Sequence, residues 1–108
     1  MGFCDVEKRR EKELGDGVLT KTFWGEHMLV SLVEIEAYSE VPAHKHPHEQ
    51  AGIVMDGEFE MWIGSKRKIL RRGDCFIVPP GIEHRVKTSE SGCKVADIFS
   101  PVREEYKY

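Results

Sequence analysis

The sequence predicts an all-β protein, built as one antiparallel barrel or sandwich. Apolar and polar residues alternate in short runs of the length that strands have. Turn-forming residues separate these runs, and the 108 residues are enough for a single domain with one core. Eight strands within about 90 residues favour a closed arrangement, because closure removes exposed sheet edges.

The chain divides into a charged segment, residues 1–17, and a barrel with a C-terminal tail, residues 18–108. We expect the first segment to be loosely ordered or packed on the barrel, with a frayed helical turn over Val6–Leu14 or no fixed structure. The expected strands cover residues 18–24, 28–38, 52–56, 58–63, 66–70, 76–78, 83–88 and 94–100.

Four turn signals punctuate these strands. Asp56-Gly57 predicts a tight hairpin and Gly64-Ser65 a second one, because glycine adopts positive φ without strain. Pro79-Pro80-Gly81 must end a strand, since proline donates no ladder hydrogen bond. Residues 89–92 form a longer polar loop.

The expected core includes two sets of apolar residues that alternate along their strands. These sets are Met28, Val30 and Leu32, and Phe59, Met61 and Ile63. Cys75 and Cys93 have the strand context of buried packing thiols.

Composition excludes several classes of function. The net charge of −3 comes without a long basic block, which argues against nucleic-acid binding. No apolar run approaches the roughly 20 residues of a membrane helix. Three cysteines without paired spacing and the absence of an apolar leader indicate a cytoplasmic protein with reduced thiols.

Three of the five histidines lie within residues 44–50. If this segment is extended, His44, His46 and Gln50 point to one face and form part of a metal site. His48 shares their parity, but Pro47 interrupts the alternation beside it. We therefore expect His48 to contact a ligand residue or the substrate.

Two spaced motifs carry a resemblance to a known family. The first is H-x-H-x3-Q-x6-G from His44 to Gly57, and the second is G-x5-P-x-G-x2-H from Gly73 to His84. Together they resemble the two motifs of the cupin superfamily, whose members are small antiparallel jelly-roll barrels with a metal inside. The family normally has Glu at the position of Gln50, and Asn at that of Thr88.

The resemblance implies a ligand set of His44, His46, Gln50 and His84 around one divalent transition metal ion per chain. Imidazole and amide ligands suit zinc, nickel, iron, manganese or copper, so the metal stays open. A neutral ligand set leaves the full charge on the ion, which suits an anionic substrate.

The string HPHEQ and the tail motif D-x-F-S-P-x-R, from Asp97 to Arg103, narrow the resemblance. Together they are similar to the pectin-degradation cupins, which linearise unsaturated uronates. This similarity implies that Asp97 is an ionised general base, that Arg103 binds the substrate carboxylate and that Phe99 packs on the sugar ring.

Other interpretations remain open at this stage. Asp97 can be a structural carboxylate paired with arginine, Phe99 a core aromatic and Arg103 a solvated charge. Other functions are a metal-dependent oxygenase and a non-catalytic module that binds or senses a sugar acid. We also expect a homodimer, paired through an exposed edge at residues 18–24.

Overall fold

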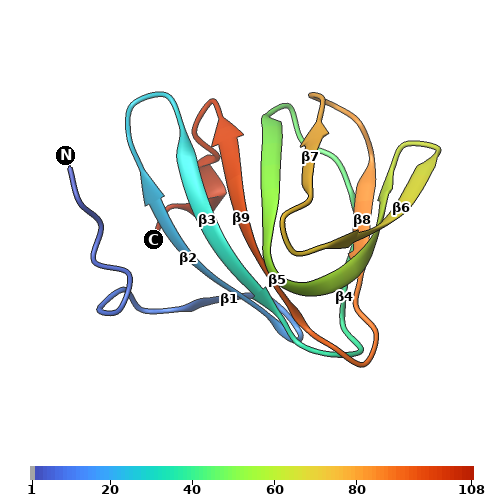
Figure 1. Ribbon diagram of the computed structural model, residues 1–108. Coiled ribbons are helices and arrows are strands. Elements are labelled where there is room, and N and C mark those ends of the chain that lie inside the picture. The colour runs from blue at the N-terminus through green and yellow to red at the C-terminus, as the bar shows by residue number, and fades with distance from the viewer. Residues whose placement is uncertain (1) are drawn as a thin grey trace.

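A computed structural model describes residues 2–108, and nearly all of the regular structure in this range is β (Figure 1). The elements are β1 (Lys12–Gly15), β2 (Val18–Trp24), β3 (Leu29–Ile35), β4 (Glu40–His44), β5 (Glu49–Ile63), β6 (Lys66–Arg71), β7 (Cys75–Val78), β8 (His84–Lys87), β9 (Cys93–Ser100) and the 3₁₀ helix η1 (Glu104–Tyr106).

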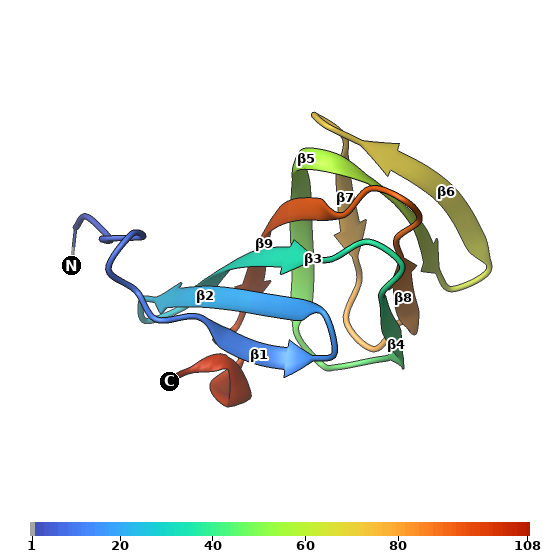
Figure 2. The ribbon, with the colours of Figure 1, turned by 90° about the horizontal axis from the view of Figure 1, so that it is seen from below.

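The strands form a nearly closed antiparallel barrel, as the sequence predicts. Their order is β1-β2-β3-β9-β5-β8-β4, and β6 and β7 also pair with β5. The barrel has two walls, and the long strand β5 belongs to both. It pairs with β7 and β9 of one wall near its start and with β6 and β8 of the other near its end (Figures 1 and 2). The start of β5 and the end of β9 lie together at one mouth of the barrel.

The hairpin predicted at Asp56-Gly57 is wrong, because β5 runs through both residues. Gly57 does have a positive φ of 73°, and the register with β9 shifts between Val54 and Asp56. The glycine therefore allows a bulge that bends one strand between the two walls, rather than a reversal. Gly64, with φ 58°, does turn the β5–β6 hairpin.

The core lies inside the barrel, and Phe59 and Met61 belong to it as expected. The assignment of Met28, Val30 and Leu32 is wrong, since Met28 is exposed and the inward parity of β3 belongs to the odd-numbered residues. These inward positions are Leu29, Ser31, Val33 and Ile35. Cys93 is buried as expected, whereas Cys75 is exposed.

The charged N-terminal segment contributes to the barrel. Residues Lys12–Gly15, expected in a helical turn or without structure, pair with β2 as strand β1. Strand β2 consequently lies between β1 and β3, so it is not the exposed edge that we expected to support a dimer.

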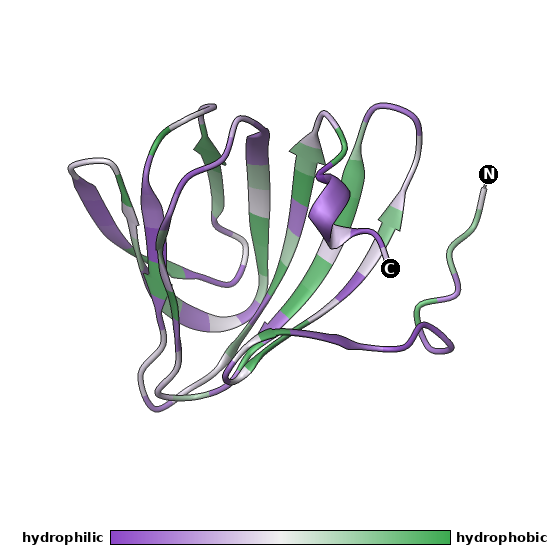
Figure 3. Cartoon of the chain, turned by 180° about the vertical axis from the view of Figure 1, so that it is seen from behind, coloured by the Kyte–Doolittle hydropathy of each residue, from purple (hydrophilic) through white to green (hydrophobic). Residues whose placement is uncertain are grey.

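The C-terminal tail returns across the barrel toward the N-terminal segment (Figure 2). Arg9 donates hydrogen bonds to the carbonyls of Thr22 and Tyr108, and Lys12 donates to the carbonyl of Glu105. Figure 3 shows η1 as a polar element that lies beside largely apolar strands of the barrel. Within residues 2–108, no helix has the length and apolarity needed to cross a membrane.

Candidate metal centre

Three histidines converge at one mouth of the barrel. His44 ends β4, His46 lies in the following loop, and His84 begins β8, directly opposite His44 in the sheet. Their nearest ligand atoms all lie within 4.8 Å of one another. The strand ends at His44, so the loop, and not the period of a strand, brings His46 to this face.

Backbone carbonyls fix the orientation of all three rings. The Nδ1 atoms of His44, His46 and His84 lie 2.8, 3.1 and 2.9 Å from the carbonyl oxygens of Pro42, His48 and Ile82 respectively. A carbonyl only accepts, so each Nδ1 carries the proton and each Nε2 keeps its lone pair. Lone pairs on Nε2 are what a metal ion requires from neutral imidazole.

The electrostatics of the cluster fit a cation. The Nε2 atom of His84 is buried and has no hydrogen-bond partner among the described residues. Burial lowers the pKa of His84 to about 4, and burial together with the charge of Arg103 lowers the pKa of His46. Both rings therefore stay neutral near pH 7, and a metal would satisfy the unpaired nitrogen.

Gln50 adjoins this cluster from the start of β5. Its side chain is buried, and its Oε1 lies 3.2 Å from Nε2 of His46. The oxygen thus faces the same space as the imidazole nitrogens, where it can serve as a fourth ligand. His48 does not join the three converging rings, and its carbonyl instead accepts the hydrogen bond that orients His46.

A cavity of about 380 Å³ extends from these residues into the barrel. Its polar end includes His44, His84, Gln50, Asp97 and Arg103, whereas core residues line the rest. The cavity thus has a polar and charged end beside the histidine cluster and an apolar interior. It has the mixed lining that small-molecule sites have.

Asp97 lies in this cavity on β9, with its Oδ1 buried and without a hydrogen-bond partner among the described groups. Burial raises its pKa to about 7, while the side chain of Gln50 and the charge of Arg103 oppose the rise. The fully ionised state expected from the sequence is therefore not favoured by the protein groups alone. The alternative of a structural carboxylate required Asp97 to pair with an arginine. None of the ion pairs among the described residues includes Asp97.

Phe99 and Arg103 face the same recess. Phe99 is buried and packs edge-on against His46, with ring centroids 5.5 Å apart. The side chain of Arg103 is only 12% exposed and its Nε lies 3.1 Å from Oε1 of Glu105, so it is not a solvated tail charge. After Ser100 and Pro101 the chain thus brings Arg103 to the cavity.

Sequence reasoning missed two residues of this site. Gly52 on β5 faces Asp97 across the ladder, and a side chain there would overlap the ring of Phe76. Tyr106 lines the cavity from η1. The only sequence signal for Tyr106 was an aromatic residue three positions after Arg103, and Tyr108 shares this signal.

Comparisons with known proteins agree with this architecture. The pectin degradation protein KdgF of Dickeya dadantii (strain 3937) is 33% identical over 106 residues, which cover 96% of each chain. An RmlC-like cupin from Shewanella frigidimarina NCIMB 400 superposes with a TM-score of 0.92 at 27% identity, covering 99% of this chain and 96% of that one.

KdgF from Halomonas sp. is 24% identical and superposes with a TM-score of 0.92 over 99% of both chains, so the two proteins share the fold. The model of the cupin domain matches residues 31–99, a range that runs from β3 to the end of β9. This range contains all three converging histidines as well as most of the barrel. The chain belongs to the cupin family.

Proposed function

We propose that this protein converts 4,5-unsaturated monouronates, released from pectin or alginate, into the linear 4-deoxy-5-keto-uronate in a metal-dependent reaction. The observation that carries the proposal is that Asp97, whose Oδ1 is buried and has no hydrogen-bond partner among the described residues, lines the same cavity as Arg103 and two of the three converging histidines, His44 and His84. The relative from Dickeya dadantii is named for pectin degradation, which supports a uronate as the substrate.

His44, His46, His84 and Gln50 are the residues that we expect to hold one divalent ion per chain. When bound, such an ion would polarise a carboxylate or ring oxygen of the substrate and stabilise negative charge that develops there. The neutral ligand set supports an anionic substrate, because nothing among these four side chains offsets the positive charge.

Two further residues would hold the sugar acid in place. Arg103 offers a planar guanidinium to the substrate carboxylate, and its pairing with Glu105 keeps the side chain at the cavity. Phe99 gives the sugar ring an apolar surface next to His46. Fixing both ends of the substrate orients its double bond toward Asp97.

Asp97 would move the protons. Water adds to the double bond, with its oxygen on C5 and a proton on C4, and Asp97 takes the proton of this water and supplies one for C4. Cleavage between C5 and the ring oxygen then gives the C5 ketone and a hydrated C1 aldehyde. Loss of water from that aldehyde completes a net isomerisation, in which atoms and charge balance.

A turnover assay tests this proposal. Unsaturated galacturonate made by a lyase is mixed with metal-loaded and chelated protein, and loss of the conjugated absorbance is followed. We expect metal-dependent acceleration over the spontaneous reaction, and a loss of acceleration in Asp97→Asn. No acceleration at confirmed metal occupancy would refute the uronate function, and oxygen consumption would favour an oxygenase instead.

We also propose that the protein is a homodimer. The outer surface of the wall formed by β2, β3, β9, β5 and β7 supports this assembly. Ile53, Met55, Ile77 and Ile98 are all at least 40% exposed on these strands, and an apolar sheet face of this kind is typical of subunit contacts. Sedimentation equilibrium tests the assembly, and a monomer at high micromolar concentration would contradict it.

A further inference from the structure

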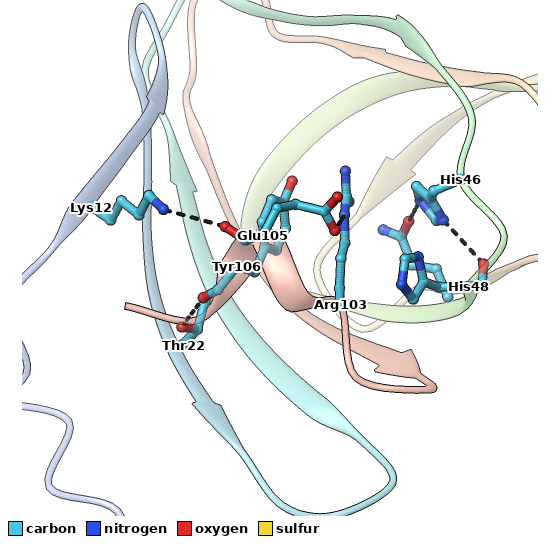
Figure 4. Close-up of polar contacts among 8 residues, drawn as sticks. Lys12, Thr22, His46, His48, Arg103, Glu105 and Tyr106 are labelled. Atoms are coloured by element: carbon cyan, nitrogen blue, oxygen red, sulfur yellow. Dashed lines mark hydrogen bonds and ion pairs between the residues drawn. The ribbon is translucent and has the colours of Figure 1, made fainter.

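Tyr106 occupies a defined place at the cavity, although it belongs to the C-terminal tail. It is the last residue of η1, and its carbonyl oxygen accepts a hydrogen bond of 2.6 Å from the buried hydroxyl of Thr22 on β2. Figure 4 shows this anchor and places Arg103 beside Tyr106, on the side that faces His46. The backbone of Tyr106 is thus tied to the barrel wall, which fixes where its ring stands.

The ring of Tyr106 contacts the two residues that we expect to hold the sugar acid. The guanidinium carbon of Arg103 lies 4.0 Å from the centre of the Tyr106 ring, within the range of a cation–π contact. Phe99 meets the same ring edge-on, with centroids 5.5 Å apart and planes at 88°. The Tyr106 ring therefore packs against both Arg103 and Phe99.

The hydroxyl of Tyr106 remains available to a ligand. Within residues 2–108 the hydrogen bonds of Tyr106 involve its backbone only. Tyr106 lines the cavity, and burial raises the pKa of its hydroxyl, while the charge of Arg103 opposes the rise. It is a neutral group that both donates and accepts, beside a carboxylate-binding guanidinium.

We propose that the Tyr106 hydroxyl contacts the substrate and hydrogen-bonds to a ring hydroxyl of the sugar acid, which makes the cavity select hydroxylated acids over plain carboxylates. The sugar-acid class rests on the proposed function, whereas the contact itself rests on the position of Tyr106. A buried polar group that a ligand leaves unpaired reduces affinity for that ligand, so one hydroxyl is enough to discriminate.

Calorimetric binding to metal-loaded protein tests the contact without any turnover. The two probes are galacturonate, which carries ring hydroxyls, and 2-furoate, a planar ring acid that carries none. In Tyr106→Phe we expect the Kd of galacturonate to rise about threefold to tenfold, as for one lost hydrogen bond, with the Kd of 2-furoate unchanged. Tyr38→Phe is the matched control, because Tyr38 is 79% exposed and does not line the cavity.

A second variant separates the hydroxyl from the ring. Tyr106→Leu removes the surface on which Arg103 stacks, so both probes should bind more weakly. Equal Kd values for wild type and Tyr106→Phe, or equal weakening of both probes by that variant, would overturn the inference. So would a metal-loaded wild type that binds neither acid.

The outcome is separable from that of the turnover assay. A wild type that binds galacturonate through Tyr106 but does not convert the unsaturated sugar would refute the proposed reaction and leave this contact standing. If the wild type does turn over, Tyr106→Phe should mainly raise KM, because the contact is made already in the bound substrate.

Discussion

Replacing Asp97 by Asn should stabilise the chelated protein at neutral and alkaline pH. The Oδ1 atom of Asp97 is buried, and desolvation raises the pKa of the carboxyl from 3.8 to about 7 in the folded state. Ionising this carboxyl therefore costs more in the folded protein than in the unfolded chain. The cost is absent below pH 3.8, grows as the pH rises toward 7, and stays constant above that value.

The size of the effect follows from the pKa difference. About three pKa units at about 1.4 kcal/mol each set an upper limit of about 4 kcal/mol at pH 8. Asparagine recovers less than this, because its amide group brings donors that also need partners in the same place. We expect a net gain of about 2 kcal/mol at pH 8 and, because the cost of the amide does not depend on pH, a net loss of about 2 kcal/mol at pH 4.

Urea unfolding of chelated wild type and Asp97→Asn at pH 4, 6 and 8 measures this difference. The variant should gain stability with rising pH and lose turnover at the same time, which is the signature of a group kept for function at a cost in stability. A free-energy difference that does not change with pH would refute the reasoning. So would a variant less stable than wild type at pH 8.

Three further changes test other parts of the site. His84→Ala should reduce metal affinity by about 100-fold or more while the barrel stays folded, as measured by competition with a chromophoric chelator. Gly52→Ala should lower the free energy of unfolding by about 1–3 kcal/mol, measured in urea, because its methyl group would overlap Phe76. Thr22→Val should reduce kcat/KM about fivefold by freeing the Tyr106 carbonyl, and unchanged metal affinity would confirm that the effect is confined to the tail.

The sequence predicts the fold class and the three histidines well, because each rests on local chemistry. His84 follows Pro80-Gly81, where the preceding strand must end. The next strand, β8, then runs back and pairs with β4. The spacing between His44 and His46 survives even though the strand ends between them. Only Lys45 separates the two histidines, which is too short a distance along the chain to carry His46 away from His44.

Two features could not be predicted from the sequence, for physical reasons: which residues of β3 point inward, and that β5 continues past Gly57. Both faces of β3 are largely apolar, and the inward position of Ser31 is polar, so alternation does not distinguish inside from outside. At Gly57 a positive φ is compatible with a hairpin and with a bulge. Only the pairing with β9 on one side and β8 on the other decides between them.

Tyr106 shows a different limit. Its place depends on the hydroxyl of Thr22, 84 residues earlier in the chain, and on contacts of the tail with Arg9 and Lys12. None of these pairs is visible as a local pattern. The tail motif up to Arg103 indicates a return toward the barrel, but the end point of that return is a tertiary property.

The structure gives a reason for glutamine, instead of glutamate, at position 50. Its oxygen faces Nε2 of His46, while its side chain also lies near enough to Asp97 to lower the pKa of that carboxyl. An amide suits both neighbours, since its oxygen can ligate an ion beside Nε2 of His46 and its nitrogen can donate to the carboxylate. A carboxylate at position 50 would place two like charges together in a buried cavity and would favour the protonated form of Asp97. Gln50 thus favours the ionised form of Asp97, which the proposed reaction requires, although an amide would bind the proposed ion more weakly than a carboxylate.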